Sequence, residues 1–164
     1  FFIACFYIPV SYNLYIAAGM FVLAYITDAV DGYLARKNQQ VTDFGKLMDP
    51  IADKLLSAAA LIMLCAIDSM IHPIAVIVIL SREFLISGLR LVSADKGVVI
   101  AASKWGKLKT ISQAICIPTV MCANAVGAKW FIITADVLVW ISVALALISG
   151  LDYVIKNKVC IKTK

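Results

Sequence analysis

Four aspartates stand at the borders of two apolar segments of this 164-residue chain. Asp28 and Asp31 are three residues apart, and Asp49 and Asp53 are four apart. At about 100° per residue, the members of each pair lie on one face of a helix, within about 60° of each other. If the two helices face each other, the four carboxylates share a small volume and cannot all stay ionised unless cations lie between them. Because carboxylate oxygens favour hard divalent cations, the spacing predicts a site for two Mg²⁺ or Mn²⁺ ions.

The segments that must position these aspartates are hydrophobic enough to lie in a membrane. Hydrophobic residues make up 63% of the chain, and its mean hydropathy is +0.96. Both values are far outside the range of soluble proteins, and the length allows five or six membrane helices with short connections. We therefore expect an all-α, polytopic membrane protein. It would form a single domain over residues 1–164, a bundle of six transmembrane helices whose first helix is truncated.

The apolar runs predict where the helices lie. Residues 1–10 are too short to cross a bilayer, so we expect them to be the end of the first helix. Residues 36–48 are expected to be a polar connection, followed by a helix with Asp49 as its cap and Pro50 in its first turn. Residues 93–109 are expected to be a second, basic connection. The five complete spans are expected at residues 14–35, about 49–67, 73–92, 108–126 and 130–155.

The basic residues gather on one side of the predicted bundle. Fourteen of the fifteen Lys and Arg residues lie in or near residues 36–54, residues 82–109 or the C-terminal tail, and only Lys129 lies in a loop on the other side. The positive-inside rule makes the first group cytoplasmic, so the aspartate site is expected to face the cytoplasm. The net charge of +5 lies beside apolar segments. It therefore fits anionic membrane lipid and phosphorylated substrates, and we expect no nucleic-acid partner.

The aspartates belong to a longer pattern that resembles a family signature. It reads Asp28-x2-Asp31-Gly32-x2-Ala35-Arg36-x8-Gly45-x3-Asp49-x3-Asp53 and resembles the signature of the CDP-alcohol phosphotransferase family at all eight fixed positions. The resemblance implies six transmembrane helices and transfer of a substituted phosphate from a CDP-linked donor to an alcohol, with release of CMP. It also implies two divalent metals held by the four aspartates, and a homodimer. We expect an enzyme of the bacterial cytoplasmic membrane.

The resemblance implies roles for individual residues as well. Asp53 matches the position assigned as general base, for which it must reach the acceptor hydroxyl. Small residues in the pattern could let a cytidine and its phosphate approach the backbone, or they could simply pack helices together. Arg36 could contact the donor or only extend to the membrane surface. The residues that match donor-binding positions are Asp28, Asp31, Gly32, Ala35, Arg36, Thr42 and Gly45.

A second group of charged residues predicts how the acceptor is bound. Arg82 and Arg90 lie about 80° apart on a helical wheel, so both could face one cavity. An arginine in the membrane costs about 2.5–3.5 kcal/mol and is usually paired or functional, and Glu83 could pair with Arg82. The group predicts a site for a phosphate dianion on the acceptor. Alternatively, the three lysines of the group could serve only to fix the orientation of the helices in the membrane. The members of the group are Arg82, Arg90, Lys104, Lys107 and Lys109.

Two longer segments narrow the resemblance within the family. Residues 35–56 and 81–110 are similar to the bacterial branch that makes phosphatidylglycerophosphate. The likeness implies transfer of a phosphatidyl group from CDP-diacylglycerol to the sn-1 hydroxyl of glycerol 3-phosphate, releasing CMP. CDP-diacylglycerol suits helices in lipid because its tails can stay in the bilayer.

Several alternatives stay open. The same chemistry could use inositol phosphate, serine or another CDP-alcohol. Magnesium-dependent membrane prenyltransferases are disfavoured because their motifs lack the Asp-Gly-x2-Ala-Arg continuation at residues 31–36. A cation transporter is disfavoured because transporters place charges near the membrane midplane rather than at helix ends.

Overall fold

The structure, a computed structural model, describes residues 2–7, 12–37, 43–67, 70–95 and 104–156. For residues 28, 29, 32–37, 43–53, 91, 92, 94 and 95 it describes the helical backbone but not the side chains. The described residues form helices and turns only, which confirms the all-α class. The helices are α1 (Phe2–Cys5), α2 (Asn13–Lys37), α3 (Asp43–Ala66), α4 (Pro73–Asp95), α5 (Lys104–Val126) and α6 (Lys129–Lys156).

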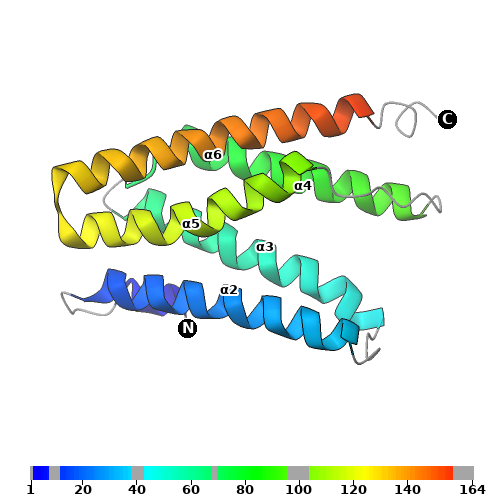
Figure 1. Cartoon of the computed structure of the whole chain (residues 1–164), viewed down its shortest axis with the longest axis horizontal. Coiled ribbons are helices and arrows are strands. Elements are labelled where there is room, and N and C mark those ends of the chain that lie inside the picture. The colour runs from blue at the N-terminus through cyan, green and yellow to red at the C-terminus, as the bar shows by residue number, and fades with distance from the viewer. Residues whose placement is uncertain (1, 8–11, 38–42, 68–69, 96–103, 157–164) are drawn as a thin grey trace.

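The five long helices lie side by side along the length of the molecule and alternate in direction (Figure 1). α5 packs against α2, α3 and α6, and α4 packs against α3 and α6. The C-terminal ends of α2, α4 and α6 therefore lie at the same end of the bundle as the N-terminal ends of α3 and α5 (Figure 1). We call this end the polar end, because the aspartate pairs and most of the described basic residues lie toward it.

Local sequence explains several helix ends. Pro73 begins α4, where a missing N–H costs no hydrogen bond, and the imidazole Nδ1 of His72 accepts a hydrogen bond from the Ile74 N–H at 3.3 Å. α5 and α6 are joined by a tight turn in which Gly127 has φ of 70°, a conformation that favours glycine. The Gly127 N–H donates to the Ala123 carbonyl at 3.0 Å and closes the end of α5. The helices expected at 73–92 and 130–155 are present as Pro73–Asp95 and Lys129–Lys156, so α4 continues three residues into the expected connection.

The prediction for the start of the third helix was wrong. α3 begins at Asp43, so residues 43–48 are helical instead of belonging to a connection, and Asp49 and Pro50 lie inside the helix. The physical reason is in the sequence: apolar residues recur at 44, 48, 51 and 55, which is the spacing of one helix face. This amphipathic pattern continues the helix beyond its apolar part. Likewise, α5 begins at Lys104, so its basic segment is helical.

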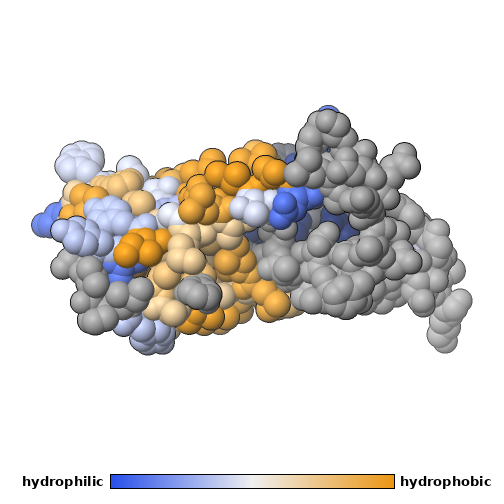
Figure 2. Space-filling view, turned by 90° about the horizontal axis from the view of Figure 1, so that it is seen from below, coloured by the Kyte–Doolittle hydropathy of each residue, from blue (hydrophilic) through white to orange (hydrophobic). Residues whose placement is uncertain are grey.

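The surface is largely apolar, as expected for a protein in lipid. Among the described residues, α6 is the one helix long and apolar enough to cross a membrane, and shorter apolar stretches lie at Asn13–Thr27 and Lys54–Ala66. Large apolar side chains such as Leu23, Ile77 and Leu151 are exposed. Figure 2 shows a hydrophobic area over the middle of the face in view, beside a more hydrophilic end that lies opposite the polar end. Such an extended apolar surface is typical of a membrane protein.

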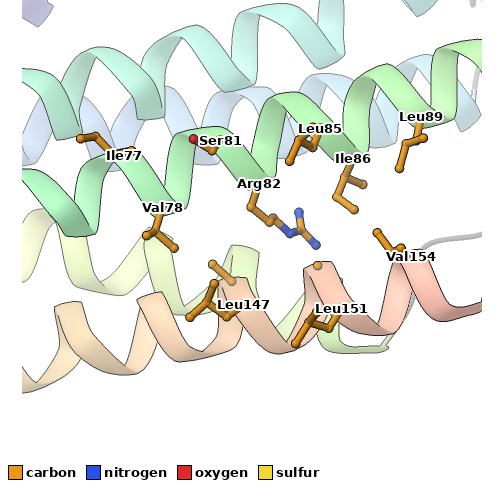
Figure 3. A pocket seen from close by; sticks show the side chains of 12 residues that line it. Ile77, Val78, Ser81, Arg82, Leu85, Ile86, Leu89, Leu147, Leu151 and Val154 are labelled. Atoms are coloured by element: carbon orange, nitrogen blue, oxygen red, sulfur yellow. The ribbon is translucent and has the colours of Figure 1, made fainter.

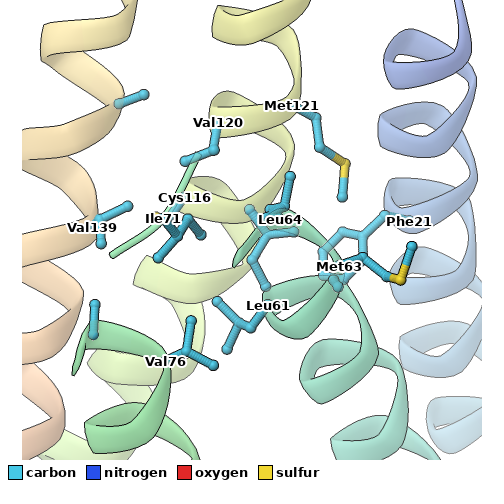
Figure 4. Close-up of a cluster of buried hydrophobic side chains, with 14 of the residues drawn as sticks. Phe21, Leu61, Met63, Leu64, Ile71, Val76, Cys116, Val120, Met121 and Val139 are labelled. Carbon is cyan, nitrogen blue, oxygen red and sulfur yellow. The ribbon is translucent and has the colours of Figure 1, made fainter. Parts of the chain in front are cut away.

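The hydrophobic core lies toward the end of the bundle opposite the polar end. It is formed by the end of α1, the first half of α2, the second halves of α3 and α5, the first half of α4, and about the first two thirds of α6. Figure 4 shows Phe21 of α2, Leu61 and Leu64 of α3, and Val120 and Met121 of α5 pointing into this core. These side chains are almost completely buried, so packing here fixes the relative positions of the helices.

Candidate functional site

The two aspartate pairs lie toward the polar end on neighbouring helices. Asp28 and Asp31 are in the C-terminal half of α2, and Asp49 and Asp53 are in the N-terminal half of α3. α2 and α3 contact each other and run in opposite directions, so the backbone brings both pairs to the same end (Figure 1). The side chain of Asp31 is exposed, whereas those of the other three aspartates lie outside the described side chains.

The metal ligands and donor contacts therefore stay predictions. Among the described side chains, no group of three His, Cys, Asp or Glu residues is close enough to hold a metal ion, but that set contains only one of the four aspartates. Gly32, Ala35 and Arg36 lie on α2 and Gly45 lies on α3, all in parts where only the backbone is described. Thr42 lies outside the described residues.

A buried cluster of charges joins α4, α5 and α6. One carboxylate oxygen of Glu83 accepts hydrogen bonds from the Arg82 guanidinium, at 3.0 Å, and from the Lys109 ammonium. The Nε of Arg82 donates to the Ser149 hydroxyl at 3.0 Å. Lys109 is only 2% exposed. We call Arg82, Glu83, Lys109 and Ser149 the charge cluster. Two cations and one anion give it a formal charge of +1.

The charge cluster depends on Glu83, because this one carboxylate is paired with two cations away from water. A buried ion pair adds little net stability to a protein. Removing one of its partners is nevertheless strongly destabilising, since it leaves an uncompensated charge in a medium of low polarity. The ion pair between Arg82 and Glu83, one alternative for Arg82 in the sequence, is thus present.

The other three predicted phosphate-binding cations are placed differently. Lys104 and Lys107 are exposed, and on the α5 wheel they lie about 140° and 160° away from the buried Lys109. Arg90 is exposed, and its guanidinium lies over the ring of Tyr153, 5.6 Å from the centroid, in a cation–π contact between α4 and α6. The structure therefore places Arg82 and Lys109 inside the bundle and the other three cations on its surface.

A small polar cavity of about 30 Å³ lies between α2, α3, α4 and α5, and Glu83 and Lys109 of the charge cluster form part of its wall. Lys54 and Ser57, one and four residues after Asp53, line it from α3, within about one helical turn of that aspartate along the helix axis. We call this space the polar cavity. Its polar lining residues are Tyr25, Lys54, Ser57, Glu83, Lys109, Thr110 and Gln113.

A larger groove of about 420 Å³ lies between α4 and α6 and has a different character. Figure 3 shows Leu85, Leu147 and Leu151 beside it, with the Arg82 guanidinium between the two helices. Ser81 and Arg82 are the polar side chains of its lining, and the rest is aliphatic. The groove offers no carboxylate for acid–base chemistry or for a metal. Despite its smaller size, the polar cavity is thus the better candidate for binding a polar substrate.

Comparison with known proteins decides the family. A family model described as CDP-alcohol phosphatidyltransferase matches residues 1–148. The chain belongs to this family. The match covers both aspartate pairs, the polar cavity and all of the charge cluster except Ser149. The resemblance predicted from the sequence is confirmed, and so is the enzyme class.

Similar CDP-alcohol phosphatidyltransferases include three bacterial proteins described as CDP-diacylglycerol–glycerol-3-phosphate 3-phosphatidyltransferase. The protein from Bacillus subtilis is 45% identical over 144 residues, which is 88% of this chain and 74% of that protein. The protein from Rickettsia felis is 41% identical over 152 residues, covering 92% and 83% of the two chains. The protein from Haemophilus influenzae is 36% identical over 156 residues, covering 93% and 83%.

Sequence reasoning missed the polar cavity and the residue that stands out in it, Gln113. This residue follows Lys109 by four positions, so both lie on one face of α5, about 40° apart. That spacing was a usable signal only if Lys109 was known to face inward. The expectation that three lysines bind the acceptor phosphate concealed it, because it treated Lys104, Lys107 and Lys109 as equivalent.

Proposed function

We propose that this chain transfers a phosphatidyl group from CDP-diacylglycerol to the sn-1 hydroxyl of glycerol 3-phosphate, releasing CMP and forming phosphatidylglycerophosphate. The observation that supports this most strongly is the complete aspartate signature on two adjacent antiparallel helices, in a chain whose relatives carry this description. The charge cluster with its net positive charge agrees with an acceptor that carries a phosphate.

The aspartates fit two divalent cations through the chemistry of their donor atoms. Asp28, Asp31, Asp49 and Asp53 would supply only hard carboxylate oxygens, which suit Mg²⁺ or Mn²⁺. Bound there, such ions would neutralise the charge of the donor diphosphate. The cytidine and its phosphate would bind along the ends of α2 and α3, next to Gly32, Ala35, Arg36, Thr42 and Gly45.

Asp53 would act as the general base of the transfer. It would take the proton from the acceptor hydroxyl while that oxygen forms a bond to the phosphorus next to the diacylglycerol. The bond between this phosphorus and the bridging oxygen breaks, and CMP leaves with that oxygen. Lys54 and Ser57 follow Asp53 on α3 and line the polar cavity, so an acceptor beside Asp53 would have this cavity within reach.

The predicted cations would bind the phosphate of the acceptor in two ways. Arg90, Lys104 and Lys107 are exposed and can form direct charge-assisted hydrogen bonds with a phosphate that arrives from solution. Arg82 and Lys109 share one carboxylate and would contribute a positive potential inside the bundle.

The surroundings of the site are part of the proposal. The chain would form one domain of six membrane helices in the bacterial cytoplasmic membrane, with the polar end at the cytoplasmic surface and a second copy as its partner in a homodimer. The apolar surface and the basic residues near the polar end support this orientation.

Identification of the lipid product tests the proposal. The full chain in detergent with Mg²⁺ would receive CDP-diacylglycerol and, in separate reactions, glycerol 3-phosphate, inositol phosphate or serine. Mass spectrometry should find phosphatidylglycerophosphate together with CMP in the first reaction only. A lipid product from another acceptor, with none from glycerol 3-phosphate, would contradict the assignment of glycerol 3-phosphate as the acceptor. Absence of CMP from all three reactions would overturn the transferase function.

A further inference from the structure

The polar cavity is lined by a buried hydrogen-bond donor for which the described protein groups supply no acceptor. Gln113 is 7% exposed, and its Nε2 has no hydrogen-bond partner in the part of the chain that the structure describes. A primary amide carries two N–H donors and one acceptor oxygen. An unpaired donor in a buried position is unfavourable, so such groups nearly always have a partner in the working protein. Because Gln113 lines the polar cavity, the partner is expected to be a molecule that enters it.

The size of the cavity limits what this partner is. A volume of about 30 Å³ accommodates two or three atoms of the size of a water oxygen, since a single water needs about 10–15 Å³. A phosphate group or a nucleobase is too large. Glu83 and Lys109 in the cavity wall are already paired with each other, so the size of the cavity, and not its charge, limits the occupant. The geometry thus favours a single small oxygen, such as a hydroxyl.

The cavity lies near the predicted general base, so this oxygen can belong to the acceptor. Lys54 and Ser57 place it beside Asp53 on α3, and Tyr25 on α2 is three residues before Asp28. A hydroxyl in the cavity would therefore lie within about one helical turn of the predicted base, measured along the helix axis. In glycerol 3-phosphate, the carbon next to the reacting one carries a second hydroxyl, which does not react.

We propose that Gln113 binds this non-reacting hydroxyl: its amide N–H donates to the hydroxyl oxygen in the polar cavity, and acceptors that carry the hydroxyl are thereby selected. This assignment rests on the proposed function. An analogue without the hydroxyl would leave the buried Gln113 amide unpaired. This penalty gives strong discrimination between acceptors with and without the hydroxyl. Gln113 is thus a specificity-determining residue, and the rest of the cavity sets the size of the group it accepts.

The test compares two acceptors in the full chain with CDP-diacylglycerol as donor. The second acceptor is 3-hydroxypropyl phosphate, which lacks only the central hydroxyl. Unmodified protein should use it with a kcat/KM about 10- to 100-fold below that for glycerol 3-phosphate. Gln113→Met removes the amide and keeps an unbranched side chain of similar length. It should lower kcat/KM for glycerol 3-phosphate by a similar factor and leave that for 3-hydroxypropyl phosphate unchanged within about twofold.

Asn124→Leu is the matched control. Asn124 is an amide on the same helix but near the opposite end of the bundle, and its Nδ2 donates to the Val120 carbonyl at 2.9 Å. This variant should leave the ratio of the two acceptors unchanged. If Gln113→Met lowers kcat/KM for both acceptors equally, the cavity holds only a structural water, and the proposal is overturned.

Two further outcomes separate the possible failures. A ratio near one in unmodified protein overturns the role of Gln113 without use of any variant, so the test stands even if Gln113→Met does not fold. Failure of unmodified protein to release CMP with glycerol 3-phosphate would count against the proposed function itself.

Discussion

The two halves of the helix bundle use the same helices for different purposes. In the half away from the polar end, side chains such as Phe21, Leu64 and Met121 are almost completely buried among apolar neighbours. In the other half, α4, α5 and α6 are joined by the charge cluster, and the polar cavity lies between four helices. α5 passes from Lys109 and Gln113 in the polar half to Ile117 and Met121 in the apolar half.

This contrast indicates that one half stabilises the protein and the other binds substrate. Burial of apolar side chains stabilises a protein in proportion to the apolar area removed from water, and close packing adds many small dispersion contacts. A buried ion cluster gives little or no net stability, because the loss of solvation offsets the attraction of the charges. The apolar half is therefore expected to fix the relative positions of the helices. The polar half can then hold buried charges that bind substrate although they add little stability.

The largest expected effect concerns Asp53. Asp53→Asn keeps the size of the side chain but removes both a proton acceptor and a metal ligand. We expect kcat for CMP release to fall by about 10³-fold or more, while the far-UV circular dichroism and thermal unfolding change little. Asp43→Asn is the matched control, because it makes the same chemical change at the start of the same helix but outside the signature. Turnover of the Asp53 variant within tenfold of normal would remove Asp53 from the role of base.

Glu83→Gln tests whether one carboxylate holds the charge cluster together. The variant leaves Lys109 and Arg82 buried with no carboxylate between them. We expect a loss of about 3–5 kcal/mol in the free energy of unfolding, measured by denaturant titration in detergent. The control Asp152→Asn breaks an ion pair whose lysine, Lys156, is 64% exposed, and it should cost only about 0.5 kcal/mol. Equal effects of the two variants would show that the charge cluster is not a special feature of the polar half.

Leu64→Ala tests the apolar half. Leu64 has no exposed surface, so its truncation should lower the free energy of unfolding by about 2–5 kcal/mol. At a temperature where the variant is still folded, the KM values for donor and acceptor should be unchanged, because the substrates are expected to bind in the polar half. A several-fold change in the KM for glycerol 3-phosphate would contradict the division between the halves.

Arg90→Ala gives the smallest of the four effects. Loss of one charge-assisted hydrogen bond should raise the KM for glycerol 3-phosphate about tenfold and leave that for CDP-diacylglycerol within about twofold. Arg90→Lys keeps the positive charge and should recover part of the loss. An unchanged KM for the acceptor in Arg90→Ala would indicate that the residue serves only its contact with Tyr153.

Much of the fold could be predicted from the sequence, because apolar runs mark helices and Pro73 and Gly127 mark their ends. The start of α3 could not be predicted in this way. Its first turns have the spacing of an amphipathic helix, but they are too polar to belong to an apolar run. In the site, sequence spacing predicted two aspartate pairs on two helices, and the backbone of α2 and α3 agrees.

The arrangement of the basic residues was harder to predict. Lys104, Lys107 and Lys109 look alike in the sequence, and only the packing of α5 against its neighbours separates the buried one from the two exposed ones. The pairing of Glu83 with its neighbour Arg82 was predicted, but its pairing with Lys109 joins residues 26 positions apart in sequence. The partnerless amide of Gln113 in the described structure likewise depends on which four helices surround it.

Counting bound Mn²⁺ tests most directly whether the ends of α2 and α3 together hold two divalent cations. The purified chain, stripped with EDTA and titrated with Mn²⁺ in the presence of CDP-diacylglycerol, would be followed by electron paramagnetic resonance. We expect two Mn²⁺ per chain, close enough for their signals to couple. Asp28→Asn and Asp49→Asn, one change on each helix, should each weaken binding and abolish the coupling. Two tightly bound ions in the variant that combines both changes would contradict a metal site formed by these aspartates.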